Sequence, residues 1–194
     1  MTIIGLERDV VRLVSYHPGW PRLFEEEKAR LQAAVGAYVL DIQPIGSTSI
    51  PGGVAKPIID IGIAVESFEG AFVCVGPMER LGYEYGGENG IPRRHYFVKR
   101  VPDTTHHVHM FEESNPAWGN HILFRDYMRK HPAAVEEYTA LKLALAERFP
   151  RDRGAYTDGK AAFIERILCL ARSDEENTRC SGKAINWNQL NKSK

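Results

Sequence analysis

Cysteine is scarce in this chain of 194 residues, and its three copies form no recognisable metal or redox motif. Cys74, Cys169 and Cys180 make an odd set without a CxxC pair, which argues against a thiolate zinc site and against a disulfide framework. Long hydrophobic runs are also missing, since no segment approaches the roughly 20 apolar residues that a membrane helix needs. Residues 1–12 lack the basic and then apolar layout of a secretory signal. These absences predict a reduced, cytoplasmic protein without a membrane partner.

An excess of charge of one sign is absent as well. The 25 Lys and Arg residues balance the 25 Asp and Glu residues, so the chain has no overall positive field of the kind that drives nonspecific binding to nucleic acid. Two nucleotide-binding motifs are also missing, because no GxGxxG joins a strand to a helix and no Walker A loop is present. The sequence therefore argues against nucleic acid as a partner, against a Rossmann fold and against a P-loop enzyme.

What the chain does contain is enough apolar material for one hydrophobic core. Its composition, 43% hydrophobic and 26% charged, is ordinary for a globular protein of one domain. We assign residues 1–172 to that domain. Residues 173–194 are polar and charged, and we expect them to form a flexible tail.

Apolar periodicity and turn residues predict strands early in the chain and helices late. The predicted strands cover residues 38–45, 57–65, 95–100 and 105–111. The predicted helices cover residues 21–35 and 68–81, two segments that begin at Asn115-Pro116 and His131-Pro132, and residues 155–170. The glycine-rich segment 83–90 is expected to be a mobile loop. This mixed order predicts an α+β (mixed α/β) fold rather than a doubly wound sheet.

The most informative segment is a turn rich in glycine and serine between two predicted strands. Gly46, Ser47 and Thr48 open this turn, and Asp60 follows on the next apolar strand. Glycine lets the backbone approach a ligand closely, and serine offers a hydroxyl and an amide to a phosphate oxygen. Asp60 is placed to hold a divalent cation against the same phosphate. The plain alternative is a tight turn followed by an ordinary strand carboxylate that caps a neighbouring group.

The run IGSTSIPGGVAKPIIDI, residues 45–61, resembles the signature of the GrpB-like family, a bacterial branch that is similar to the nucleotidyltransferase superfamily. Further matching residues are Tyr16 with Trp20 and Phe24, His107 with His109, the run FRDYM at 124–128, Tyr138 with Leu141 and Lys142, and Tyr156 with Lys160 and Phe163. The resemblance implies a nucleotidyltransferase-like mixed sheet with flanking helices and a helical C-terminal third. It also implies a Gly-Ser turn that faces the phosphates of a nucleoside triphosphate substrate, strand carboxylates that bind metal, and a small-molecule acceptor.

One position departs from the pattern of that superfamily. The superfamily places a second carboxylate two residues after the first, on the same strand face, and Gly62 stands there in this chain. A lone Asp60 supplies at most part of one cation site, which argues against conventional two-metal transfer.

His107 and His109 are the compensating candidates, because alternate residues of a strand share one face. Imidazole favours Zn²⁺, Mn²⁺, Co²⁺ or Ni²⁺ over Mg²⁺. We assign Asp60, His107 and His109 as catalytic residues and metal ligands, with Mg²⁺, Mn²⁺ or Zn²⁺ as the cofactor. The two histidines could equally donate hydrogen bonds to phosphate, act as a general base or be ordinary strand histidines, with His106 on the opposite face.

Four basic residues complete the predicted phosphate site. Lys142 and Lys160 lie on the apolar sides of their predicted helices, where an ammonium group needs an anionic partner or a route to solvent. Lys56 precedes the strand of Asp60, and Arg125 could either clamp phosphate or form a structural ion pair. A second basic group, Arg93, Arg94 and Lys99, is expected to be a solvated face.

Three functions remain open at this point. The first is metal-assisted transfer of a nucleotidyl group to a small acceptor. The second is a nucleotide-binding module that kept the phosphate turn and lost the second carboxylate. The third is a metal-dependent phosphoesterase built around Asp60, His107 and His109.

Overall fold

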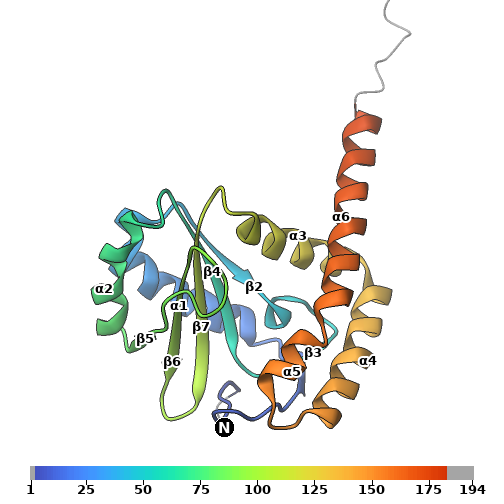
Figure 1. Cartoon of the computed structure of the whole chain (residues 1–194), viewed down its shortest axis with the longest axis horizontal. Helices are drawn as coiled ribbons and strands as arrows, with labels where there is room; N and C mark the ends of the chain where they lie inside the picture. The colour runs from blue at the N-terminus through green and yellow to red at the C-terminus, as the bar shows by residue number, and fades with distance from the viewer. Residues whose placement is uncertain (1–2, 183–194) are drawn as a thin grey trace, which may run out of the picture.

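A five-stranded mixed sheet organises the chain, of which the computed structural model describes residues 3–182, with side chains up to residue 176 (Figure 1). The strand order is β2-β4-β7-β6-β5, with β4 and β7 parallel and the other neighbours antiparallel. The strands are β2 Asp41–Ile45, β4 Ile59–Val65, β5 Tyr83–Tyr85, β6 Arg94–Arg100 and β7 Thr104–Glu112. A second, two-stranded sheet pairs β1 Val14–Ser15 with β3 Val54–Ala55. The predicted α+β fold is confirmed.

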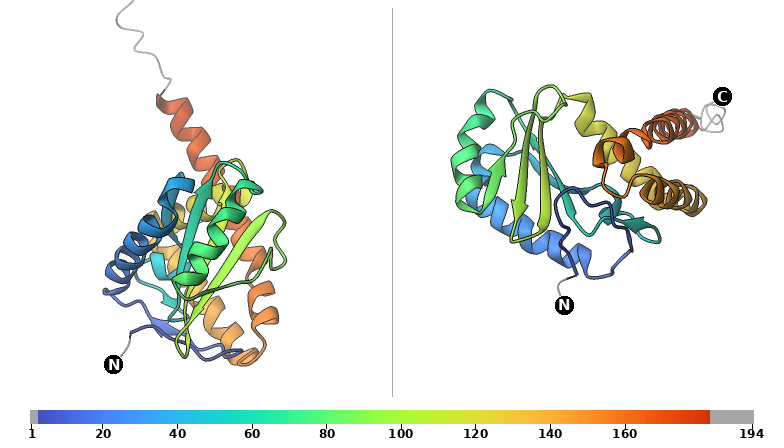
Figure 2. Two further views of the ribbon diagram at one scale, coloured as in Figure 1. Left: turned by 90° about the vertical axis from the view of Figure 1, so that its left-hand side faces the viewer. Right: turned by 60° about the horizontal axis from the view of Figure 1, so that its bottom comes forward.

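Helices cover both faces of the five-stranded sheet (Figure 2). On one side lie α1 Trp20–Val35, the 3₁₀ helix η3 Gly70–Cys74 and α2 Val75–Arg80. On the other side lie α3 Pro116–Lys130, α4 Pro132–Arg148, α5 Arg153–Asp158 and α6 Ala161–Gly182, which form the helical C-terminal third. Short 3₁₀ helices η1 Gly36–Tyr38 and η2 Ser47–Ser49 flank β2. Within residues 3–182, none of the helices combines the length and the apolar character needed to cross a membrane.

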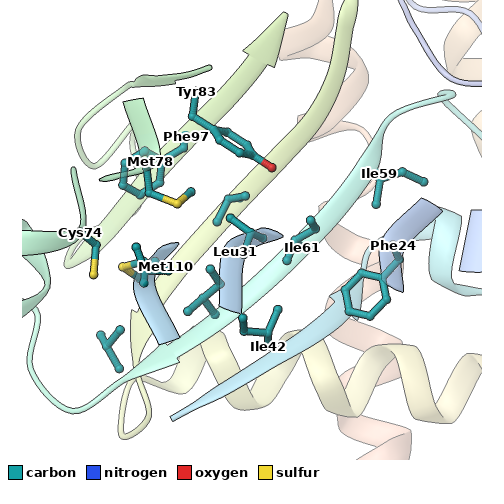
Figure 3. Close-up of a cluster of buried hydrophobic side chains, with 14 of the residues drawn as sticks. Phe24, Leu31, Ile42, Ile59, Ile61, Cys74, Met78, Tyr83, Phe97 and Met110 are labelled. Atoms are coloured by element: carbon teal, nitrogen blue, oxygen red, sulfur yellow. The ribbon is translucent and has the colours of Figure 1, made fainter. Parts of the chain in front are cut away.

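Alternation along β4 separates the hydrophobic core from the polar face. Ile59, Ile61 and Ile63 point to the side of α1, where they pack in the cluster that includes Phe24, Leu31 and Met110 (Figure 3). Asp60 and Gly62 therefore point to the side of α3. Because β4 and β7 are parallel, the register sets Asp60 beside His107 and Gly62 beside His109. His106 points to the α1 side, so the predicted division of these histidines between the two faces is confirmed.

The helix starts follow the predicted capping signals. Pro116 opens α3, and the side chain of Asn115 accepts a hydrogen bond from the amide of Ala117. Pro132 opens α4 in the same way, but His131 provides no side-chain cap. Pro44 lies in β2, which is an edge strand and can therefore tolerate a residue without an amide hydrogen.

Three predicted boundaries are wrong. Residues 68–81 form η3 and the short α2 rather than one helix, and residues 83–85, predicted to be loop, form β5 because they pair with β6. The predicted helix 155–170 is broken at Gly159, where a Cβ would lie 2.5 Å from Leu145. After the break, α6 continues to Gly182, so residues 173–182 of the expected tail are helical (Figure 1). The rest of that expected tail, residues 183–194, lies outside the described residues.

Candidate functional site

A cavity of about 490 Å³ lies between the polar face of the sheet and the C-terminal helices. The structure brings most of the predicted site residues to its wall, namely Gly46, Ser47, Lys56, Asp60, His107, His109 and Lys160. Lys142 joins them through its side chain, which donates a hydrogen bond to Ser47 (Nζ to Oγ 3.1 Å). Two predicted phosphate ligands lie elsewhere. Thr48 lines a second hollow, and the guanidinium of Arg125 is engaged by Gln43, the Pro44 carbonyl and Asp126.

The turn at Gly46 requires glycine for two reasons. Its φ of 65° lies in the left-handed region, which side chains with a Cβ disfavour. A Cβ at this position would also lie 2.5 Å from Oδ2 of Asp60. The backbone of the turn is thereby held directly against the carboxylate, and the hydroxyl of Ser49 closes the turn by donating to the Gly46 carbonyl (2.7 Å).

Asp60, His107 and His109 form a compact cluster of potential metal ligands. Each offers one ligand atom, and these atoms lie within 4.8 Å of one another. Burial alone would raise the pKa of Asp60, but the imidazoles of His107 and His109 hold it well below its ordinary value. Burial lowers the pKa of His107. One ionised carboxylate and two imidazole nitrogens are a donor set that suits Zn²⁺ or Mn²⁺ better than Mg²⁺.

Hydrogen-bond partners assign the tautomers of the two histidines. Nδ1 of His107 lies 3.1 Å from Oδ1 of Asp60, and an ionised carboxylate only accepts, so this nitrogen carries a proton. Nη1 of Arg94 lies 3.2 Å from Nδ1 of His109, and a guanidinium only donates. Nε2 of His109 therefore carries the proton in the neutral ring, 3.9 Å from Oδ1 of Asp60. A cation entering between the three residues must displace both protons, and Arg94 opposes this at His109.

A second carboxylate has no room at position 62. A Cβ added to Gly62 would lie 2.9 Å from Cζ3 of Trp118 and 3.1 Å from Cγ2 of Ile45. Trp118, on the first turn of α3, thus covers the position that holds the second carboxylate in the superfamily pattern. The absence of a carboxylate there is built into the packing of α3 on the sheet.

Three lysines make the other end of the site electropositive. Burial and the neighbouring Lys160 lower the pKa of Lys142 to about 7, and its ammonium also donates to the Val54 carbonyl. Burial, with Arg153 and Lys160, lowers the pKa of Lys56 to about 8, and burial likewise lowers the pKa of Lys160. Asp60 is the one carboxylate among the described residues that line the cavity. The site therefore holds more basic groups than acidic ones.

Two basic residues of the cavity, Arg94 and His121, were not assigned to the site from the sequence. Arg94, predicted to be solvated, is buried and donates hydrogen bonds to the carbonyls of Glu88 and Asn89. Lys99, from the same predicted solvated face, lies outside the cavity and forms a salt bridge with Glu27. His121 of α3 lies beside His109, and burial lowers its pKa to about 4. His121 lies one helical turn after Trp118, and this spacing could have indicated from the sequence that both side chains face the sheet.

Together the fold and the site define an α+β protein with a cavity, lined by ionisable side chains, on one face of a mixed sheet. The family model described as GrpB protein matches residues 10–169, and the chain belongs to this GrpB family.

Related proteins match most of the chain. UPF0157 protein YqkA of Bacillus subtilis is 45% identical over 155 residues, which are 80% of this chain and 45% of that protein, so the chain spans less than half of that relative. Glutamate-rich protein GrpB of Alkalihalophilus pseudofirmus is 37% identical over 171 residues, 86% of this chain and 98% of that protein. The crystal structure of conserved protein GrpB from Enterococcus faecalis matches with a TM-score of 0.78 and 38% identity, covering 84% of this chain and 99% of that one.

Gly62→Ala is expected to lower the free energy of unfolding by about 1–3 kcal/mol, because its Cβ collides with Trp118 in a packed interface. Gly119→Ala is the matched control, since a Cβ there meets nothing within 4 Å and alanine favours the helix. Urea unfolding measures both variants. Equal stability of the two variants would contradict the packing described at Gly62.

Arg94→Met is expected to raise the affinity for Zn²⁺ by about tenfold or more, because His109 can then present an unprotonated Nε2. Calorimetric titration with Zn²⁺ measures this, with Arg93→Met as the control because Arg93 pairs with Glu69 and Glu112 outside the cavity. Adding His109→Ala to Arg94→Met should cancel the gain. A gain that survives in the double variant would mean that Arg94 acts only through its charge.

Proposed function

We propose that this GrpB-family chain binds a nucleoside triphosphate in the cavity of about 490 Å³ that Asp60 lines, called the main cavity below, and transfers its nucleotidyl group to a small acceptor. The observation that carries the proposal is a group of three lysines at the cavity. The buried Lys142 donates to Ser47 of the turn, and the half-buried Lys56 and Lys160 line the wall, where Asp60 is the one carboxylate among the described residues. The likeness of residues 45–61 to the signature of the GrpB-like family, a branch that is similar to the nucleotidyltransferase superfamily, supports the same conclusion.

The lysines need an anionic ligand of high charge. Removing an ammonium group from water is costly unless it meets a counter-charge, and the lowered pKa values of Lys56, Lys142 and Lys160 reflect that cost. A triphosphate brings several negative charges to this point. Ser47 and the glycine turn would bind phosphate oxygens directly, while Lys142, already bonded to Ser47, would donate from the side.

Asp60, with His107 and His109, would hold the divalent cation. Their donor atoms are near enough to share one ion, although His109 must first lose its contact with Arg94. When bound, the cation would neutralise phosphate charge and polarise the phosphoryl oxygens. The nucleotide's own oxygens would complete a coordination sphere that the protein fills only in part.

The residues of the chain would contribute by positioning the nucleotide and by neutralising the charge of its phosphates. The acceptor oxygen or nitrogen would form a bond to the α-phosphorus, and the bond from that phosphorus to pyrophosphate would break. Lys142 and Lys160 lie where they would neutralise the leaving pyrophosphate. The proton of the acceptor would pass to water, because the cation would occupy Asp60 and His107.

The packing at Gly62 favours a second candidate function. With Trp118 over the position of a second carboxylate, the site resembles one that retains nucleotide binding without rapid turnover. This candidate shares the phosphate site and differs only in the chemical step.

Thermal-shift measurements with nucleoside triphosphates, each with Mg²⁺, Mn²⁺ or Zn²⁺, test the binding step. Release of pyrophosphate in the presence of a mixture of hydroxyl and amine acceptors tests the transfer. Stabilisation without pyrophosphate supports the binding module, and hydrolysis of a phosphate monoester or diester without an acceptor supports a phosphoesterase. Failure of every nucleotide to stabilise the protein would overturn both forms of the proposal.

Lys142→Met is expected to weaken triphosphate binding by about tenfold or more, because a charge-assisted hydrogen bond is lost. Phosphate favours the charged form of Lys142, whose pKa in the empty site is about 7, so binding takes up a proton. Affinity should therefore fall as the pH rises from about 7 to about 9, and this fall should be shallower in Lys142→Met.

Calorimetric titration at several pH values measures this effect, with Lys130→Met on the exposed side of α3 as the control. An affinity that does not depend on pH in the unmodified protein would contradict the assigned role of Lys142.

A further inference from the structure

A second, smaller cavity of about 290 Å³ adjoins the main one. The first half of the turn, Gly46 and Ser47, faces the main cavity, whereas Thr48 and Ser49 face the smaller one. Asp60 is the single residue that lines both. The two cavities thus share one residue of the candidate site, Asp60.

The walls of the smaller cavity are largely aromatic and apolar. Tyr16 and Trp20 pack edge to face, with ring centroids 5.4 Å apart, and Phe24 continues this wall along α1. Ile59 of β4 and Pro44 of β2 also line it. A volume near the lower limit for small-molecule sites, with rings on one side, suits a compact ligand with an apolar or aromatic body.

One guanidinium gives this apolar cavity a specific anion contact. Nε of Arg129 donates to the carbonyl of Ser49 (2.9 Å), which fixes the side chain against the turn. Its Nη1 lies 4.0 Å from Asp126, beyond hydrogen-bond distance, so the guanidinium retains donors for a ligand. A planar guanidinium held in this way matches a carboxylate group.

The charges around the smaller cavity disfavour a triphosphate there. Arg129 is the one basic residue among the described residues that line it, which is enough to pair with a single carboxylate but not with a triphosphate. The main cavity also offers its own apolar wall, including Phe124, Ile164 and Leu168, for the nucleoside part of a nucleotide. The smaller cavity is therefore available to a second ligand.

We propose that the smaller cavity is the acceptor site and that the acceptor is a small carboxylic acid with an apolar or aromatic body and a free hydroxyl or amine. This inference rests on the proposed function. Arg129 binds the carboxylate, the aromatic wall holds the body, and the hydroxyl or amine reaches the boundary at Asp60. There it forms its bond to the α-phosphorus, the bond from that phosphorus to pyrophosphate breaks, pyrophosphate leaves, and the proton of the hydroxyl or amine passes to water.

The test uses 4-hydroxyphenylacetate as the probe and 4-hydroxyphenylethanol as its uncharged counterpart, each added to the full chain without nucleotide. Intrinsic fluorescence reports binding because Trp20 lines the cavity, and calorimetry gives the affinity. We expect the acid to bind at least tenfold more tightly than the alcohol. Arg129→Gln should remove this preference, whereas Arg22→Gln, an exposed change on α1, should retain it.

A second variant keeps the test independent of the contact between Arg129 and the turn. Tyr16→Leu alters the aromatic wall and leaves the guanidinium in place, so it should weaken both probes and retain the preference for the acid. Nucleotide affinity, measured separately, should be unchanged in Arg129→Gln.

The outcomes separate this inference from the proposed function. Absence of binding by either probe, or an acid preference that survives in Arg129→Gln, overturns the acceptor site while nucleotide binding can still hold. A parallel loss of nucleotide and acid binding in Arg129→Gln would assign the smaller cavity to the nucleotide and overturn the inference. Acid binding in a chain that binds no nucleotide would retain a carboxylate site and refute its role in transfer.

Discussion

The parallel pairing of β4 with β7 is the constraint on which the site depends. It joins Asp60 to His107 across 47 residues of sequence and sets their side chains on the same face of the sheet. The pair is central, with β2 antiparallel on one side and β6 on the other. Hydrogen bonds on both sides fix the register, so the spacing of the ligand cluster follows from the backbone rather than from flexible loops.

The two faces of this strand pair differ in polarity, since one packs in the hydrophobic core and the other lines the polar cavity. Toward α1, the isoleucines of β4 build a continuous core (Figure 3). Toward α3, the same strand presents a carboxylate and a glycine, and the helices that cover this face bring buried basic groups such as Lys142. A core of this kind can offset the cost of leaving cations underpaired on the other face, which is a common arrangement where stability is sacrificed for a binding site.

Much of the sheet and part of the site could be predicted because they depend on local patterns. Alternation along the predicted strand 105–111 set His107 and His109 on one face, and the missing second carboxylate at Gly62 suggested that they join Asp60. Proline with a capping residue marked the start of α3. Arg94 could not be placed this way, since its burial results from the backbone of residues 88–89 folding over it. The strand β5 likewise depends on a partner distant in sequence, β6.

Three of the nine residues of β7 are histidines, at positions 106, 107 and 109, and their division between the two faces has a consequence for length variation. His106 faces the side of Glu27, while its neighbour His107 faces the cavity. A single inserted or deleted residue at the start of β7 would exchange these two environments and turn Val108 toward Asp60. Relatives of this protein should therefore vary in length at the hairpin turn 101–103 or in residues 86–90, and keep a constant number of residues through β4 and β7.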